Sequence, residues 1–532
     1  MLYRFPWLGW MAFIAVALGE ALLSRNGDQQ TAPPTRRGTR ALVAVGIAAV
    51  LVFAVRAVAA ITRPGRNVDE AASAMFAEFA RSTGESLFSK PWIFRTYAAV
   101  YLAGSLKDPY TWVDTITSAV VALTGVLIGL TALSLGSGAW AGPLAVVAYP
   151  LGILGFEGLS SNKEPYANLF IAAYLFVRLR PGDMTSRRAL LTGLCLGGAV
   201  VGKDQTVVLA LAEPIVVAWQ FMRGEGPRPP RALKHVALMA TGALIPPTFI
   251  LCGFALHGQL GAFIATLSNW AVSAGSPMAS WRAFDPTDGG TTQVDVRTWF
   301  GAYLAYWGNP VTLAGIAQLT ALTVDGRRGR GVRPPLVAIA TLSLAMISVG
   351  QRWFGHYYML AVPVLTLLFV LWVPEMRDAL RAPRRRVFAA ALGVFMLYGL
   401  TMTLVSMTAP LGRYLMDGGA IWPPQRGPFE HAAAFLRQRT PEGERILVWG
   451  WQPELYVAAQ RSPVTRVVDP GLGTKRQAVD DLKRYGPPAA VVLPGPNHFG
   501  VSPQAAFVYE LSRHPDVARW LVEHHYVRAL LP

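Results

Sequence analysis

The chain has 532 residues, of which 53% are hydrophobic and only 15% are charged, whereas roughly 25% of the residues of an average soluble protein are charged. This composition excludes a soluble globular enzyme and predicts a polytopic α-helical membrane protein. The only two cysteines, Cys195 and Cys252, both lie in apolar stretches. Neither a disulfide framework nor a cysteine-based zinc cluster is therefore expected.

About twelve apolar stretches are candidate membrane spans. They lie near residues 5–23, 41–61, 116–136, 139–157, 165–178, 189–203, 205–221, 236–256, 298–323, 335–350, 355–373 and 387–408. The stretches 165–178 and 189–203 are short for spans, so we expect them to borrow flanking residues or to tilt.

The net charge of +17 comes largely from the short connections between these stretches. The connections 24–40, 178–188, 222–235, 324–334 and 374–386 together hold 21 Lys and Arg residues but only six Asp and Glu residues. Short basic loops beside membrane spans stay in the cytoplasm. This rule places both termini and the loops 62–115, 158–164 and 257–297 outside. Because membrane orientation accounts for the charge, nucleic-acid binding is not needed to explain it.

The first outer loop contains two predicted helices. From Asp69 to Arg81, apolar residues recur with the spacing of one helix face. They are Ala72, Met75, Phe76 and Phe79. Asp69 is suited to cap this helix, and Glu70 favours its positive end. The stretch 92–106 is too short to span and is interrupted by Arg95. We expect both helices to lie in the membrane interface.

After Met407 the pattern changes from apolar runs to alternating polar and apolar residues. The pattern predicts strands at 445–451 and 489–493, and helices at 453–460, 475–485 and 503–526. We therefore expect a membrane domain over residues 1–408 and a small α/β domain outside the membrane over 409–532.

The sequence contains no Walker loop, no HExxH motif and no nucleophile elbow. Six short motifs instead resemble, in family order, those of the GT-C glycosyltransferase superfamily, and most of all its bacterial PMT/ArnT-like members. They are Asn67-Val-Asp69-Glu70 with Lys90-Pro91, Ser161-Asn-Lys-Glu164-Pro, Gly197–Lys203, His257-Gly258 to Asn269, Gly355-His356-Tyr357-Tyr358 to Pro363, and Trp449–Pro453 to Tyr456. The resemblance covers residues 41 to 470.

This resemblance implies a GT-C fold and a polyprenyl-phosphate sugar donor. The acceptor would be a lipid, a glycan or a protein of the envelope, on the outer face of the bacterial cytoplasmic (inner) membrane. The chain departs from the family at Ser73, at Trp92 and at Ser89, which stands where some members carry an acid. A divalent cation stays open as a cofactor, because Ser89 removes an acid that the resemblance would otherwise supply.

The chemistry of sugar transfer points to the same residues. The reaction needs cations on the leaving phosphate and a carboxylate near the acceptor hydroxyl. The predicted topology collects such groups on the outer face, namely Asp69, Glu70, Glu164, Lys90, Lys203, Arg352 and His356. We expect Asp69 to be the general base, with Glu164 or Glu70 orienting the acceptor or a cation. Lys90, Lys203, Arg352 and His356 are expected to hold the donor phosphate.

Each of these residues also has a structural interpretation. Asp69 and Glu70 suit a helix start, and the three candidate cations suit snorkelling anchors at span ends. Glu164 can pair with Lys163 or begin the next span, and His356 suits an aromatic belt.

Two other functions stay open at this point. A transporter or flippase for a lipid-linked saccharide should carry inverted repeats and mid-membrane charges, which the sequence does not suggest. A scaffold that presents 409–532 would leave the first outer loop without a role.

Overall fold

The computed structural model describes residues 36–62, 68–84, 109–154, 161–224, 229–264, 310–324, 333–347, 355–381, 428–449, 452–465, 475–492 and 515–524. The predicted spans 5–23 and 387–408, the predicted helix 92–106 and most of the loop 257–297 lie outside these residues.

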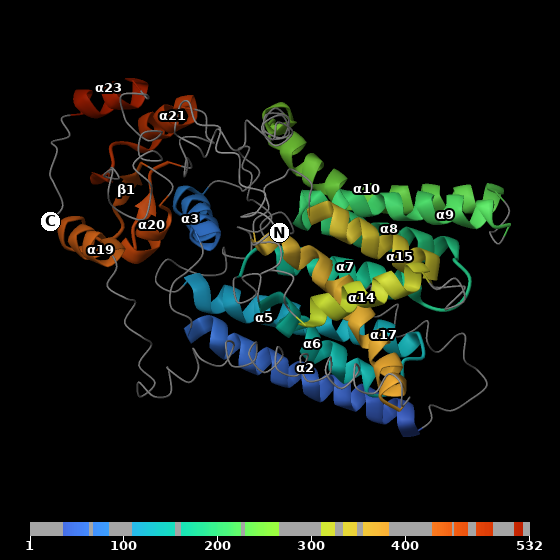
Figure 1. The fold of residues 1–532 in the computed structure, drawn as a ribbon. Helices are drawn as coiled ribbons and strands as arrows, with labels where there is room; N and C mark the ends of the chain where they lie inside the picture. Colours follow the sequence, from blue (N-terminus) through green and yellow to red (C-terminus); the bar gives the residue numbers. More distant parts are fainter. Residues whose placement is uncertain are drawn as a thin grey trace, which may run out of the picture.

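Helices occupy the predicted spans that fall within the described residues, and they form one bundle (Figure 1). They are α2 (Arg36–Thr62), α5 (Pro109–Ser134), α6 (Ala141–Leu154), α7 (Glu164–Leu179), α8 (Ser186–Gly202), η1 (Asp204–Leu211), α9 (Ala212–Met222), α10 (Pro229–Leu256), α14 (Pro310–Val324), α15 (Arg333–Ile347), α16 (Gly355–Tyr358), η2 (Met359–Ala361) and α17 (Val362–Arg381). The predicted span 205–221 differs from a plain α-helix, because its first seven residues belong to the 3₁₀ helix η1.

Four of the described helices are long and apolar enough to cross a membrane: Gly38–Ile61, Tyr110–Ser134, Asp204–Met222 and Pro230–Leu256. Four apolar helices are shorter: Ala141–Leu154, Val311–Thr323, Pro334–Ile347 and Met359–Pro374. A total of about twelve spans stays a prediction.

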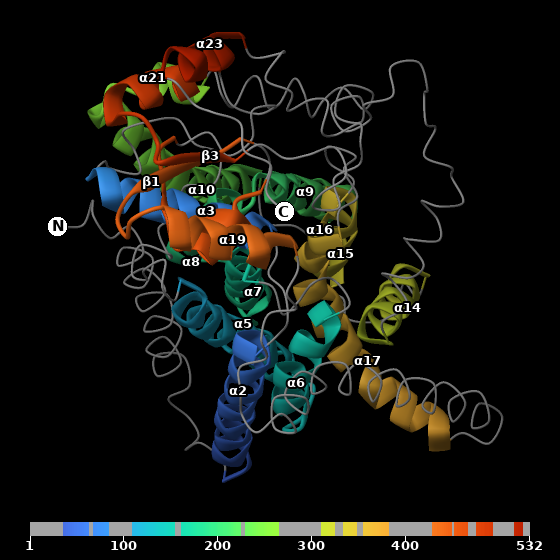
Figure 2. The ribbon, with the colours of Figure 1, turned by 90° about the vertical axis from the view of Figure 1, so that its left-hand side faces the viewer.

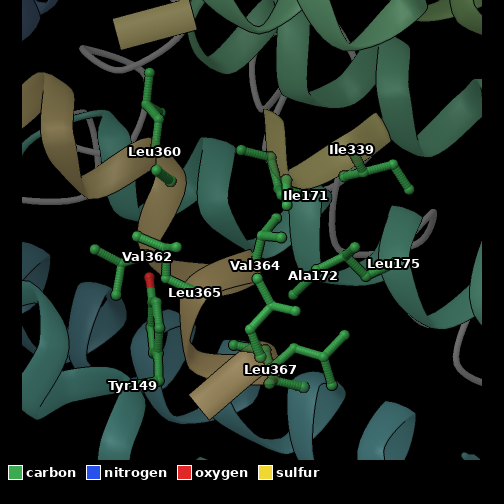
Figure 3. Packing of buried hydrophobic residues seen from close by; sticks show 14 of the residues in the cluster. Tyr149, Ile171, Ala172, Leu175, Ile339, Leu360, Val362, Val364, Leu365 and Leu367 are labelled. Carbon is green, nitrogen blue, oxygen red and sulfur yellow. The ribbon is translucent and has the colours of Figure 1, made fainter. Parts of the chain in front are cut away.

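The core of the bundle is formed by α5, α6, α7 and α17 together with parts of α8, α14 and α15. Figure 3 shows buried side chains of this cluster, among them Tyr149, Ile171, Leu175 and Leu365. Within lipid, such contacts stabilise through close packing rather than through the exclusion of water. Glycines promote this packing, because a Cβ on Gly197 of α8 would collide with the Ala243 carbonyl of α10.

Basic connections gather at one end of the bundle. Arg188 donates hydrogen bonds to carbonyls at the end of α7 and in the turn that follows it, including that of Val177 at 2.8 Å. Arg178 pairs with Glu213 of α9, and Arg231 of α10 lies 3.9 Å from Asp183. The connections 178–188 and 222–235 therefore share one end, as the positive-inside rule requires of two loops on the same side.

The C-terminal unit, defined here as the described residues from 428 to 524, contains a small parallel sheet. Its strands are β1 (Arg445–Val448), β2 (Ser462–Pro463) and β3 (Ala490–Val492), in the order β2-β1-β3. Its helices are α19 (Pro428–Arg439), α20 (Glu454–Ala459), α21 (Lys475–Tyr485) and α23 (Pro515–Glu523). Parallel strands require crossovers, and α20 and α21 provide them. In register, Ile446 lies opposite both Pro463 and Ala490.

The terminal motif Trp449 to Tyr456 supports this sheet. The Val448 amide donates to the Tyr456 hydroxyl at 2.7 Å, and Trp449 is buried against α21 and α23. Burial raises the pKa of the Tyr456 phenol above its usual range, so the hydroxyl stays protonated at the end of β1. Both residues therefore have a structural role.

Helix α3 (Val68–Thr83) lies between the bundle and the C-terminal unit (Figures 1 and 2). Residues 70–80 are all buried. The amphipathic helix is thus confirmed, and its apolar face packs on protein rather than on lipid. Its position relative to the membrane interface stays a prediction. The described helix begins at Val68, which puts Asp69 inside its first turn rather than at its cap.

The positive-inside rule predicts which end of the helical bundle is accessible from outside the cell. Cys252 would first be changed to serine, since it is exposed, while Cys195 is buried. We expect Glu444→Cys to react with an impermeant thiol reagent in intact cells, and Asp183→Cys to react only after permeabilisation, because Asp183 belongs to a basic connection. The reverse labelling pattern would show that the predicted topology is inverted.

Candidate functional site

A buried ion pair lies at the end of the bundle opposite the basic connections. The ammonium of Lys203 is 2.5 Å from Oε1 of Glu164. The two side chains are 3% and 0% exposed, so Lys203 does not snorkel to water. The pair joins the first residue of α7 to the residue that follows α8. Glu164 is also the first residue of α7, as one of its two structural interpretations predicted.

Small residues before Lys203 bring α8 close enough to form this pair. A Cβ on Gly198 would collide with the Phe170 ring of α7, and one on Gly202 would lie 3.1 Å from the Ala167 Cα atom. α8 then ends, and Lys203 adopts an extended conformation with φ −153° and ψ 115°. The hydroxyl of Thr206 donates to the Lys203 carbonyl at 2.8 Å, which stabilises the turn into η1.

An aromatic ring completes the surroundings of Lys203. Its ammonium lies 4.0 Å from the centroid of the Tyr357 ring, within the range of a cation–π interaction. Tyr357 belongs to the Gly355–Tyr358 motif of α16, next to His356. The glycine-rich motif, the Ser161–Pro165 motif and the tyrosine motif therefore meet at one point.

A second polar cluster surrounds Ser161, and we call it the Ser161 clamp. The Ser161 backbone amide donates to Oε1 of Glu70 in α3, and its hydroxyl donates to Oδ1 of Asp114 in α5 at 2.5 Å. All three residues are buried. Glu70 thus fixes the backbone of the segment that leads to Glu164.

Arg56 brings a positive charge into the same region. Its Nη1 donates to the Ser118 hydroxyl at 2.8 Å, and this hydroxyl donates to the Asp114 carbonyl at 2.6 Å. Arg56 is 1% exposed. A buried guanidinium is costly without an opposite charge, and Glu70 and Asp114 provide the negative charge of this region.

The ion pair and the Ser161 clamp form one site because the chain connects them directly. Ser161 and Glu164 are three residues apart, so their Cα atoms lie within about 11 Å of each other. Asp69 precedes Glu70, which places its Cα about 3.8 Å from that of Glu70. The site thus combines carboxylates on α3, α5 and α7 with a lysine after α8.

Not every predicted site residue is placed by the structure. Asp69 and His356 lie in the helices α3 and α16, but the structure does not describe their side chains. Lys90 and Arg352 lie outside the described residues. Their expected roles therefore stay predictions.

Sequence reasoning missed Asp114 and Arg56. Both are charged residues inside helices that are apolar enough to cross a membrane, and an ionisable residue in such a helix is a functional candidate by default. That signal was available, but Asp114 fell just before the predicted span 116–136.

A metal ion at this site would need several ligands from the same residues. Within the described residues, no group of three or more His, Cys, Asp or Glu side chains is arranged to hold a metal ion. Glu70 and Asp114 are engaged with Ser161. The described side chains alone therefore do not fit a divalent cation.

Sequence comparisons return no match, either to a family model or to a curated protein. Among solved structures, the chain is similar to ArnT from Cupriavidus metallidurans in the apo state, with 15% identity and a TM-score of 0.48 over 84% of this chain and 89% of ArnT. It is also similar to the same ArnT bound to undecaprenyl phosphate, with 14% identity and a TM-score of 0.47 over 79% of this chain and 85% of ArnT.

The Archaeoglobus fulgidus oligosaccharyltransferase in the apo form is a further match, with 13% identity and a TM-score of 0.49 over 81% of this chain. The chain spans 64% of that enzyme's length. Because the identities are low, we base the function on residues of this chain.

The buried ion pair predicts a specific pattern of stability. We expect Glu164→Gln to lower the free energy of unfolding by about 3–5 kcal/mol, because it leaves the Lys203 charge buried without its counter-ion. Lys203→Met should act similarly. The double variant should recover much of the loss, since both charges are then gone. Thermal unfolding in one detergent measures this, and additive losses would contradict the pairing.

Proposed function

We propose that the chain is an integral-membrane glycosyltransferase of the GT-C type. It would move a sugar from a polyprenyl-phosphate donor to a lipid, glycan or protein acceptor on the outer face of the bacterial cytoplasmic membrane. One observation carries the proposal: Lys203 and Glu164 form a buried pair beside the Ser161 clamp, at the bundle end opposite the basic connections. The donor class follows from the motif resemblance.

Lys203 is suited to bind the donor phosphate. A lysine ammonium has three N–H donors, and one of them is directed at Glu164. The remaining two can point toward phosphate oxygens. Because Lys203 is already held by Glu164 and Tyr357, little side-chain freedom is lost when the phosphate binds. Lys90, Arg352 and His356 are proposed to complete the phosphate site.

Asp69 is proposed to take the proton of the acceptor hydroxyl. Its neighbour Glu70 is fixed by the Ser161 amide, so the first turn of α3 is held against the segment that carries Glu164. As the hydroxyl oxygen attacks the anomeric carbon, the bond to the phosphate oxygen breaks. The polyprenyl phosphate leaves as a stabilised anion, so no general acid is required. A single displacement inverts the anomeric configuration.

The alternative is a transporter or flippase for a lipid-linked saccharide, in which the same groups only bind the headgroup. Transport should place ionisable residues near the middle of the bundle. Here Glu164 and Lys203 lie at the helix ends, where α7 begins and α8 stops. This position favours a glycosyltransferase over a transporter.

Asp69→Asn is the direct test of the general base. Asparagine keeps the shape of the side chain but cannot accept the proton, so we expect turnover to fall by about 100-fold or more. The variant should remain folded in membranes. Transfer at a near-wild-type rate would show that the base lies elsewhere.

Assays in detergent separate the enzyme from the transporter, since detergent leaves no two sides to transport between. We expect the purified protein to transfer sugar from a polyprenyl-phosphate donor to a suitable acceptor. Lys90→Met keeps the apolar stem and removes the charge. It should lower kcat as well as donor affinity, because the phosphate gains charge in the transition state. If the wild type transfers nothing across a broad panel of donors and acceptors, the transporter is favoured.

A further inference from the structure

We infer that the C-terminal unit is a positioning element of the active site, because it holds helix α3 and with it Asp69 and Glu70. The contact is made two turns farther along α3, by Glu78, Phe79 and Ser82. The catalytic consequence of this inference rests on the proposed function. Whether the C-terminal unit stabilises α3 can be measured without an activity assay.

Two polar contacts join α3 to the sheet of the C-terminal unit. The hydroxyl of Ser462 in β2 donates to Oε1 of Glu78 at 2.8 Å, while Arg81 lies 2.5 Å from the other carboxylate oxygen. Arg445 of β1 donates to the Ser82 carbonyl at 2.9 Å. This carbonyl belongs to the last turn of α3, where carbonyls lack intrahelical partners and a cation is favoured by the helix dipole.

The two faces of α3 differ in the size of their side chains. The face toward the C-terminal unit carries Met75, Phe76 and Phe79, which pack on α19, α20 and β1. The Phe79 ring also meets Tyr485 edge-on, with 5.5 Å between centroids. The face toward the bundle carries Ala74 and Ala77, which pack near Val113. Large side chains bury more apolar area than alanines, so most of the apolar hold on α3 comes from the C-terminal unit.

α3 can transmit this hold to the catalytic end. Asp69 and Glu78 are separated by nine residues, or about 14 Å along one continuous helix. A misplacement of about 1 Å at reacting groups can cost roughly 100-fold in rate. A loosened C-terminal unit would therefore impair the geometry at Asp69.

The test uses the full-length protein in detergent and the double variant Ser462→Ala/Arg445→Met, which removes both polar contacts. Hydrogen–deuterium exchange should rise about 10-fold or more in peptides covering residues 68–83, with no change in α7 and α8. In the transfer assay, kcat should fall about 10-fold while the donor KM stays within about twofold. Ser462→Thr retains the hydroxyl and should behave like the wild type.

Val517→Ala is the matched control. It truncates a buried residue of α23 in a cluster of the same unit that contains no α3 residue, so it should loosen α23 without affecting exchange in 68–83 or kcat. Equal effects of the control and the double variant would mean general destabilisation and would overturn the inference.

Two further outcomes would also overturn it. Unchanged exchange in 68–83 would mean that the unit does not hold α3, and raised exchange with unchanged kcat would mean that the hold does not position the site. A wild type without transfer activity would instead refute the proposed function and the catalytic consequence, while exchange would still decide whether the unit holds α3.

Discussion

Burying opposite charges in an otherwise apolar helical bundle is the constraint on which the site depends. Lys203 and Glu164 are almost completely inaccessible, and a charge in such surroundings is tolerated only beside its counter-ion. Their pairing in turn requires α7 and α8 to approach closely, which Gly198 and Gly202 allow. The glycine-rich motif is thus explained by the charge that follows it. Arg56 and the carboxylates near Ser161 satisfy the same constraint on the other side of the site.

Helix α3 links this charged end of the bundle to the C-terminal unit. Its first turn is tied to the bundle by Glu70, and its last two turns are tied to the sheet by Glu78 and Ser82. One short helix therefore has its two ends fixed by different parts of the chain. Such an arrangement suits a residue like Asp69, whose proposed role demands a fixed position relative to groups on several helices.

Much of the helical arrangement could be predicted from the sequence, because apolar stretches and basic connections are strong local signals. The face of α3 was predicted as well, since Met75 and Phe79 recur with helical spacing. Its partner could not be predicted, because a local pattern does not distinguish lipid from protein at residues 428–492. Similarly, Glu164 and Lys203 were singled out individually, but their pairing depends on how two helices pack. Asp114 was missed because it falls just before the predicted span 116–136, and its contact with Ser161 depends on tertiary packing.

The hold on α3 also has a consequence for biosynthesis. Glu78 and Ser462 are 384 residues apart, and ribosomes add roughly 5–20 residues per second. α3 is therefore synthesised about 20 to 80 seconds before the C-terminal unit on which it packs. During that interval Met75, Phe76 and Phe79 have no C-terminal unit to pack on. A nascent chain at this stage exposes the apolar face of a short amphipathic helix, which makes it a substrate for chaperones or for transient association with the lipid surface.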